Sequence, residues 1–400
     1  MSSTTVKGRR ALFLVHRLNL SGVSRQNMLL ATGLQARGWE IAVATRDLQR
    51  GTSMGVEWFE AAGVLVFEAP FPVYGLTVHN AASALRTIVA LHRIVEEFRP
   101  DIIHVHAPTL CPYAGIIGWA HWVPTVSTLH IESLGPNKLR LARLGTRWFS
   151  KAFGDLSIAI SGDMSRVLID SLGISPDRVR TIVHGVDEEH FRPPTADERA
   201  RARQAFQLAD SQPVACLIAV LEERKGHNLL IRALAALRRR GLDVVALCAG
   251  TGEAADIDRV RRHAREAGVG DLVHLLGYQD SRQVMWASDA SLLLSSREGF
   301  GLAIVESMLC GLVPLRTPAA GASDQIIDGQ TGFIIPFNDD AILADRLFRL
   351  FNDPTTRTRL GSAARQFALG RFTGNVMAQT TEAVYEEAID RFIPRFVPFT

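Results

Sequence analysis

The sequence predicts an α/β protein built from two parallel-sheet domains. Short apolar runs of strand length alternate with helix-length amphipathic segments along the chain, which is the pattern of parallel strands covered by helices. The pattern restarts after a polar, proline-bearing segment at His184–Pro194, which we interpret as the hinge between the domains. A chain of 400 residues that is 47% apolar can fill two such cores. Disorder, a coiled coil and a disulfide-stapled miniprotein are thereby excluded.

The first half of the chain holds apolar runs bounded by turn residues, with amphipathic stretches between them. The expected strands are Ala11–His16, Glu40–Thr45, Val64–Ala69, Ile102–His106, Thr125–His130, Ser157–Ser161 and Arg180–His184. The expected helices are Ser24–Arg37, Ala81–Phe98 and Asp163–Leu172. We take residues 1–190 as the first domain.

The second half repeats the alternation, beginning with a helix at Asp197–Leu208. The expected strands are Val214–Leu221, Val244–Ala249, Leu272–Leu276, Ala290–Leu294, Val313–Leu315 and Gly332–Ile335. A long helical pattern at Gly374–Arg391 follows the last strand, so we expect residues 191–373 to form the second domain and residues 374–400 to return to the first. Ligands in such folds bind beyond the carboxyl ends of the strands, so a cleft between the domains is the expected site.

Composition and cysteine usage narrow the function classes and the location. The 44 basic and 41 acidic side chains give a net charge of +3 without the basic stripe of a nucleic-acid binder. Four widely spaced cysteines form no metal or redox pair, so we interpret them as small buried hydrophobes in a reducing cytoplasm. No window resembles a signal peptide or a membrane span, so at most peripheral contact with the inner face of a membrane is expected.

The densest chemical signal is the segment Ser295–Glu306, which reads SSREGFGLAIVE. Gly299 and Gly301 would let the backbone approach a ligand closely, and the helix that follows would direct free N–H groups and its positive dipole end at a phosphate. Glu298 and Glu306 flank this turn at different depths. Carboxylates suit sugar hydroxyls better than phosphate, because hydroxyls can donate hydrogen bonds to them.

Other candidate signals are weaker. The loop Asn19–Ser24 lacks the G-x-G-x-x-G spacing of a dinucleotide fingerprint, which argues against a dehydrogenase. Gly250 and Gly252 form a lone G-x-G for which an ordinary turn is the simpler interpretation. His104 and His106 alternate on one strand without an acidic or cysteine partner at ligand spacing, so we interpret them as structural and expect no metal site.

The chain resembles glycosyltransferase family 4, a family of retaining, metal-independent enzymes of GT-B architecture that use nucleotide sugars. The resemblance lies in two glutamates around E-G-F-G-L and extends to other motifs in the same order along most of the chain. These motifs are Gly311–Pro314 (GLVP), Asp328–Phe333 (DGQTGF), Lys225–Gly226, Gly250–Gly252, Leu276–Gly277, Ser161 and His184–Asp187 (HGVD). It implies two Rossmann-like domains facing across a cleft, with the donor on the second and the acceptor on the first.

The resemblance also implies roles for individual residues. Glu306 would hold the ribose hydroxyls, Glu298 the transferred sugar, and Lys225 the diphosphate; Lys225 is one of four lysines in an arginine-rich chain. The histidine that ends the strand Thr125–His130 would contact the donor sugar. The implied catalytic residues are His130 and Glu298, and the implied donor-binding residues are Gly22, Arg224, Lys225, Gly250, Gly252, Tyr278, Phe300, Gly301, Leu302 and Glu306.

Three positions depart from the family pattern. Val220 stands where the family usually has an arginine that assists the phosphate lysine, and Arg224 is the candidate substitute. Gln325 stands where a glutamate is common, and Gly22 is alone where two glycines are common. Such cations supply several kcal/mol of transition-state stabilisation, so the clamp is either rebuilt or weakened.

The sequence thus predicts a retaining, metal-independent glycosyltransferase that moves a sugar from a nucleotide sugar, a UDP-sugar by preference, to a hydroxyl acceptor. No cofactor beyond the donor is expected, and the acceptor is a small molecule, a glycan or a lipid-linked molecule. Two alternatives stay open: a GT-B nucleotide-sugar epimerase, and a non-catalytic protein that binds a sugar nucleotide or a partner. A basic amphipathic pattern at Asn137–Phe153 fits either a surface helix or weak membrane contact.

Overall fold

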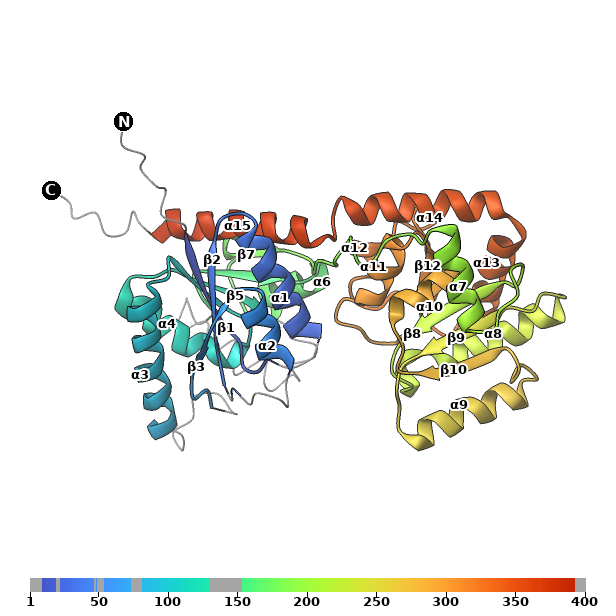
Figure 1. The fold of residues 1–400 in the computed structure, drawn as a ribbon, viewed down its shortest axis with the longest axis horizontal. Helices are drawn as coiled ribbons and strands as arrows, with labels where there is room; N and C mark the ends of the chain where they lie inside the picture. Colours follow the sequence, from blue (N-terminus) through green and yellow to red (C-terminus); the bar gives the residue numbers. More distant parts are fainter. Residues whose placement is uncertain are drawn as a thin grey trace. The chain divides into compact units, whose positions relative to one another are not determined.

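The chain folds into two compact α/β units (Figure 1). The structure is a computed structural model, and it describes residues 9–18, 22–46, 48, 54–72, 81–129 and 153–392. Unit 1 comprises the chain up to Gly185 together with the part from Gly374 onward, and unit 2 comprises Val186–Thr373.

Unit 1 is a seven-stranded parallel sheet in the order β3-β2-β1-β4-β5-β6-β7. Its strands are β1 (Arg10–Leu14), β2 (Glu40–Thr45), β3 (Leu65–Glu68), β4 (Ile102–Val105), β5 (Thr125–Leu129), β6 (Leu156–Ala159) and β7 (Val179–Thr181), of which the edge strands β3 and β7 are the least buried. Its helices are α1 (Gly22–Gln35), α2 (Met54–Ala61), α3 (Ala81–Phe98), α4 (Cys111–His121), α6 (Gly162–Arg166), which continues as a π-helix over Val167–Ser171, and α15 (Gly374–Phe392).

Unit 2 is a six-stranded parallel sheet in the order β10-β9-β8-β11-β12-β13. Its strands are β8 (Val214–Ile218), β9 (Val245–Ala249), β10 (Val273–Gly277), β11 (Ala290–Leu293), β12 (Val313–Arg316) and β13 (Phe333–Ile334). Its helices are α7 (Ala196–Ala205), α8 (His227–Arg239), α9 (Ala254–Glu266), α10 (Ser281–Ala287), α11 (Leu302–Leu309), α12 (Ala322–Gln325), α13 (Asp340–Asn352) and α14 (Pro354–Leu369).

The predicted fold class is confirmed, and each expected strand has a counterpart in the two sheets. Two helices of unit 1, α2 and α4, were not predicted. The α4 sequence CPYAGIIGWAH is apolar on nearly every side, so it lacks the polar stripe that marks a surface helix. The chain enters unit 2 after Gly185, whereas the sequence places the boundary at residue 190. The backbone N–H of Val186 already donates a hydrogen bond to the carbonyl of Phe372 in unit 2.

Helix α15 belongs to unit 1 although it follows all of unit 2 in the sequence (Figure 1). It packs closely on α1, where a Cβ added at Gly33 would lie 2.7 Å from Cβ of Ala378. Glu382 accepts a hydrogen bond from the indole of Trp39 at 2.9 Å. Tyr385 is fully buried, and its hydroxyl lies 2.6 Å from Nδ1 of His104. These contacts fasten the helix to the first sheet.

The four cysteines are buried and carry no disulfide, as expected. Burial raises the pKa of the Cys216 thiol to about 11 and that of Cys111 and Cys248 to about 12, so these thiols are unreactive at neutral pH. In the part of the chain that the structure describes, no helix combines the length and apolar character needed to span a bilayer.

Candidate active site

The candidate site lies at the point where the strand order of unit 2 reverses. The chain runs from β8 outward through β9 and β10 on one side, and then returns to β11 on the other side of β8. The loops that leave the carboxyl ends of β8 and β11 therefore diverge, and ligands of open parallel sheets bind in the crevice between such loops. One of these loops carries Lys225, at the end of the 3₁₀ helix η5 (Glu223–Lys225), and the other carries Glu298.

Lys225 and Glu298 meet directly across these two loops. The ammonium of Lys225 donates to Oε1 of Glu298 at 2.6 Å, and the two side chains are only 12% and 11% exposed. The backbone N–H of Ser296 donates to the carbonyl of Arg224 at 2.8 Å, which joins the two loops a second time. Gly226 packs against the backbone of Leu294, where a Cβ would not fit. The sequence predicted both charged residues as ligands but not that they bind each other.

The turn before α11 depends on Gly301. This residue is the N-cap of α11 with φ +84°, and a Cβ on it would lie 2.6 Å from Cδ2 of Leu293. The left-handed conformation and the close strand both require glycine. Phe300 is 3% exposed, and its ring packs edge-on against Phe372. Only the backbone of Phe300, and not its side chain, is therefore available to a ligand.

A buried arginine supports this turn through hydrogen bonds to its backbone. Arg316 is fully buried at the end of β12, and its Nη1 donates to the carbonyl of Phe300 at 3.2 Å and also to Oε1 of Gln325. Gln325 is also fully buried, and its Nε2 donates to the carbonyls of Phe300 and Gly301 at 2.8 and 3.3 Å. The carbonyls of the turn thus point inward, which suits an outward-facing set of N–H groups.

This arrangement explains one departure from the family pattern. The amide of Gln325 accepts from Arg316 and donates to two carbonyls at once, whereas an ionised glutamate could only accept. Sequence reasoning missed Arg316. The available signal was an arginine at the end of the otherwise apolar strand VPLR.

Glu306 lies on the second turn of α11, the helix that begins after Gly301. Its side chain is half-buried. Cys310 lies four residues further along, and burial and, secondarily, the carboxylate of Glu306 raise the pKa of its thiol. The structure thus puts Leu302 and Glu306 on one helix, with Glu298 on the loop that precedes it.

The two glycines of the G-x-G segment follow β9 and pack against the chain beyond β8. A Cβ on Gly250 (φ +151°) would clash with the carbonyl of Ala219, and one on Gly252 would lie 2.8 Å from Cβ of Leu221. This close packing accounts for both glycines without a ligand. Tyr278 follows the end of β10 and is 78% exposed, so its ring is available for stacking.

The Arg224 guanidinium is engaged by partners other than the Lys225–Glu298 pair. Its Nε donates to Glu222 at 2.5 Å, and its Nη1 donates to the carbonyl of Arg297 at 3.4 Å. The side chain lines a pocket of about 670 Å³. The other lining residues are Glu223, Gly226, Asn228, Leu229, Arg232, Leu294, Ser296, Thr317, Phe337 and Asn338. Lys225 and Glu298 are not among them, so the Arg224 guanidinium is held by Glu222 and the carbonyl of Arg297 beside this pocket rather than at the Lys225–Glu298 contact.

Two predicted residues belong to unit 1. His130 lies outside the described residues, as does most of the basic segment at Asn137–Phe153. Gly22 is exposed at the start of α1, and a Cβ on it would meet no atom within 4 Å of the described chain. Packing against the described residues of unit 1 therefore does not require glycine at this position.

His104 is structural, as expected. It is fully buried, and its ring nitrogens lie 2.6 Å from the hydroxyl of Tyr385 and 2.7 Å from that of Thr128. Both nitrogens are thus engaged within unit 1. Within the described ranges, one group of side chains has metal-ligand spacing, and it consists of His92, Glu96 and His121 of unit 1.

His227 follows Gly226 at the start of α8 and is buried beside the site. Neither ring nitrogen meets a hydrogen-bond partner among the described residues. Burial, followed by the nearby charges of Arg259 and Lys225, lowers the pKa of His227 from 6.5 to about 4. The folded state therefore holds this ring neutral over a pH range in which the unfolded chain protonates it.

We therefore expect acid to destabilise the protein through His227. Stability from this residue is complete above pH 6.5, and it is lost as the pH falls toward 4, because only the unfolded state takes up the proton. Between pH 7 and pH 5 the loss is about 2 kcal/mol. Urea unfolding at several pH values should show a flatter dependence for His227→Gln than for the wild type. The exposed His190→Gln is the control and should keep the wild-type slope.

The chain contains two Rossmann-like parallel-sheet units, which is the GT-B class of α/β proteins. A glycine turn and a charged pair lie at the switch point of the second sheet. Two family models match this chain. The model "Glycosyltransferase Family 4" matches residues 20–190, and "Glycosyl transferases group 1" matches residues 198–367. The chain belongs to the family 4 type of glycosyltransferases, which transfer a sugar from a nucleotide sugar.

Individual relatives agree with this assignment. The D-inositol 3-phosphate glycosyltransferase of Saccharomonospora viridis is 29% identical over 389 residues, covering 90% of this chain and 88% of that protein. A glycosyltransferase from Rickettsia africae has the same fold, with a TM-score of 0.82 at 19% identity, covering 96% of this chain and 99% of that one. HepE from Anabaena, solved with UDP and glucose, gives 0.78 at 21% identity, covering 95% and 100%. The expected family and architecture are confirmed.

Proposed function

We propose that this chain is a retaining glycosyltransferase that passes a hexosyl group from a UDP-sugar to a hydroxyl acceptor. The observation that carries the proposal is the Lys225–Glu298 pair beside the Gly301 turn, at the switch point of unit 2. A lysine ammonium suits a diphosphate, a carboxylate suits sugar hydroxyls, and free N–H groups at a helix start suit a phosphate.

Each residue then has one task. Lys225 binds the diphosphate, and Glu298 binds hydroxyls of the transferred sugar. The backbone N–H groups of Phe300, Gly301 and Leu302 bind the β-phosphate, and Glu306 binds the ribose. Tyr278 offers an exposed ring to the base, and the family resemblance assigns the loop of Gly250 and Gly252 to donor binding, although packing alone explains both glycines.

The charges of the site support a reaction without a metal. As the sugar–phosphate bond breaks, negative charge grows on the β-phosphate, and Lys225 together with the positive end of α11 would stabilise it. In a front-face reaction the departing phosphate oxygen takes the proton of the acceptor hydroxyl. No carboxylate of the protein then acts as a nucleophile, and the configuration at the sugar carbon is retained.

The choice of UDP rests on the solved relative HepE, which was crystallised with UDP and glucose. The family resemblance assigns His130 to contact with the donor sugar and Gly22 to donor binding. No described residue of unit 1 lies within 4 Å of a Cβ built on Gly22, so the described part of the chain leaves this backbone open to a ligand. The buried, unpaired cysteines support a reducing compartment, the cytoplasm.

A second candidate function is a non-catalytic protein that binds a sugar nucleotide. Two observations favour a binding protein. Val220, which is 38% exposed, stands where the family clamp has a cation, and Arg224, the candidate substitute, is engaged by Glu222. Binding and transfer are separable by experiment.

The proposal is tested by thermal unfolding with UDP-, GDP- and ADP-sugars, followed by a transfer or hydrolysis assay with the sugar that protects most. Saturation at 100 times the dissociation constant adds about 2.7 kcal/mol of stability. We expect protection by a UDP-sugar, turnover that persists in a chelator, and a product with the anomeric configuration of the donor. Protection without turnover would favour the binding protein, and an inverted product would refute retention.

Replacing Glu306 with alanine is expected to weaken nucleotide binding about 10–100-fold, because hydrogen bonds to a charged group contribute about 1.5–3 kcal/mol. Calorimetric titration with UDP measures this change. Glu266→Ala, an exposed carboxylate at the end of α9, is the matched control and should bind like the wild type. Equal affinity in the Glu306 and Glu266 variants would remove Glu306 from the site.

A further inference from the structure

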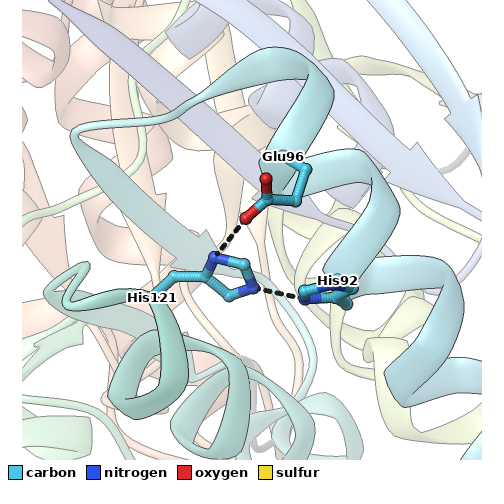
Figure 2. Close-up of side chains that lie close together, drawn as sticks. All are labelled: His92, Glu96 and His121. Atoms are coloured by element: carbon cyan, nitrogen blue, oxygen red, sulfur yellow. Dashed lines mark hydrogen bonds and ion pairs between the residues drawn. The ribbon is translucent and has the colours of Figure 1, made fainter.

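Three side chains of the types that can bind a metal ion gather on unit 1 where α3 and α4 meet (Figure 2). His92 and Glu96 lie one turn apart on α3, and His121 is the last residue of α4. One ligand atom from each lies within 4.8 Å of the other two. His92 and Glu96 are exposed, whereas the His121 side chain is only 12% exposed and is therefore held in place by its surroundings.

The ring of His121 lies between the other two side chains (Figure 2). Its Nδ1 is 3.2 Å from Oε1 of Glu96, and its Nε2 is 2.7 Å from Nδ1 of His92. When Nδ1 of His121 carries the proton, it donates to the carboxylate, and Nε2 directs its lone pair at His92. The two facing ring nitrogens then share a single proton, the one on His92.

That shared proton occupies a position that a cation can take. Zn²⁺ binds imidazole nitrogen at about 2.0–2.1 Å in tetrahedral geometry, which places two ligating nitrogens about 3.3 Å apart. The observed separation of 2.7 Å is shorter, and the exposed His92 side chain is free to open it.

Glu96 contacts the ring nitrogen of His121 that faces away from His92. A ligating histidine usually donates its other N–H to a carboxylate, which fixes the tautomer and raises the basicity of the ligating nitrogen. One ion cannot use both nitrogens of His121, so Glu96 orients this ring rather than binding the ion. The i, i+4 spacing of His92 and Glu96 on α3 holds both on the same face.

We propose that His92 and His121 bind one divalent transition-metal ion of the Zn²⁺ class on the surface of unit 1. Nδ1 of His92 and Nε2 of His121 are the protein ligands, water fills the remaining positions, and the shared proton leaves to solvent. Imidazole favours zinc, copper and nickel over the oxygen-seeking Mg²⁺ and Ca²⁺. The ion links α3 to α4 within unit 1, and it plays no part in the sugar transfer proposed for unit 2.

The test is a Zn²⁺ titration of the full-length chain against a competing chromophoric chelator. We expect the wild type to bind one Zn²⁺ at this site in the presence of excess Mg²⁺. His92→Ala and His121→Ala should each weaken that binding at least tenfold, and Glu96→Gln should weaken it about 10–100-fold. His190→Ala, which removes an exposed histidine from unit 2, is the matched control and should bind like the wild type.

Thermal unfolding provides a second readout that does not depend on the chelator. Zn²⁺ should raise the melting temperature of the wild type and of His190→Ala, but not that of His92→Ala. Thermal unfolding without metal shows whether each variant is folded. If His92→Ala is not folded, His92→Gln is used in its place. Wild-type binding no tighter than that of His92→Ala, or an equal loss in His190→Ala, overturns the proposal.

Discussion

Replacing Lys225 with methionine is expected to lower the turnover number of sugar transfer about 100–1,000-fold, the usual effect of removing one preorganised group that stabilises developing charge. Lys225 is the ammonium that lies 2.6 Å from Glu298 at the proposed diphosphate site. The variant also leaves the largely buried carboxylate of Glu298 without its partner, which costs stability in its own right. Steady-state kinetics and urea unfolding measure the two effects separately.

A double variant separates the catalytic role of the pair from its structural role. Glu298→Gln alone should also remove most of the transfer while leaving the fold intact. Lys225→Met combined with Glu298→Gln removes both charges, so stability should recover relative to Lys225→Met, while turnover should stay low. If activity recovers together with stability, the pair is structural, and the proposed roles of both residues are wrong.

Replacing Arg316 with methionine is expected to destabilise the protein by about 3 kcal/mol or more. The change leaves the carbonyls of Ala319 and Ala320 and the amide oxygen of Gln325 without the donor that now serves them, and each buried unsatisfied group costs about 1–3 kcal/mol. Because the same guanidinium holds the carbonyl of Phe300, nucleotide binding should weaken as well.

Urea unfolding and UDP titration measure these two effects for Arg316. Arg261→Met, on the exposed surface of α9, is the matched control and should change stability by no more than about 0.5 kcal/mol. Gln325→Leu should reproduce part of the loss, because it removes the two donors to Phe300 and Gly301. Wild-type stability in Arg316→Met would mean that this buried network does not support the turn.

The strands were predictable because parallel sheets bury both faces, which leaves apolar runs such as VACLI in β8 and VALCA in β9. Helix α4 was not, because a helix that is apolar nearly all round has no period to detect. The turn at Gly301 was predictable from local motif spacing.

The contacts that shape the site were not predictable from local sequence. Lys225 binds Glu298 across 73 residues, and His92 binds His121 across 29, so only the folded sheet and helix packing bring these partners together. Arg316 gave one local hint, an arginine in an apolar strand, but most of its acceptors are backbone carbonyls, which any residue supplies. Local pattern thus identified the elements and the ligand turn, and long-range packing determined which side chains support them.

The most direct test of the central claim is amide hydrogen exchange of the wild-type protein with and without the UDP-sugar that protects it most. We expect slower exchange at the amides of Phe300, Gly301 and Leu302 and around Lys225, because the phosphates are proposed to bind there. Unchanged exchange at these amides, with protection elsewhere in the chain, would contradict the assignment of the donor to the β8–β11 switch point of unit 2.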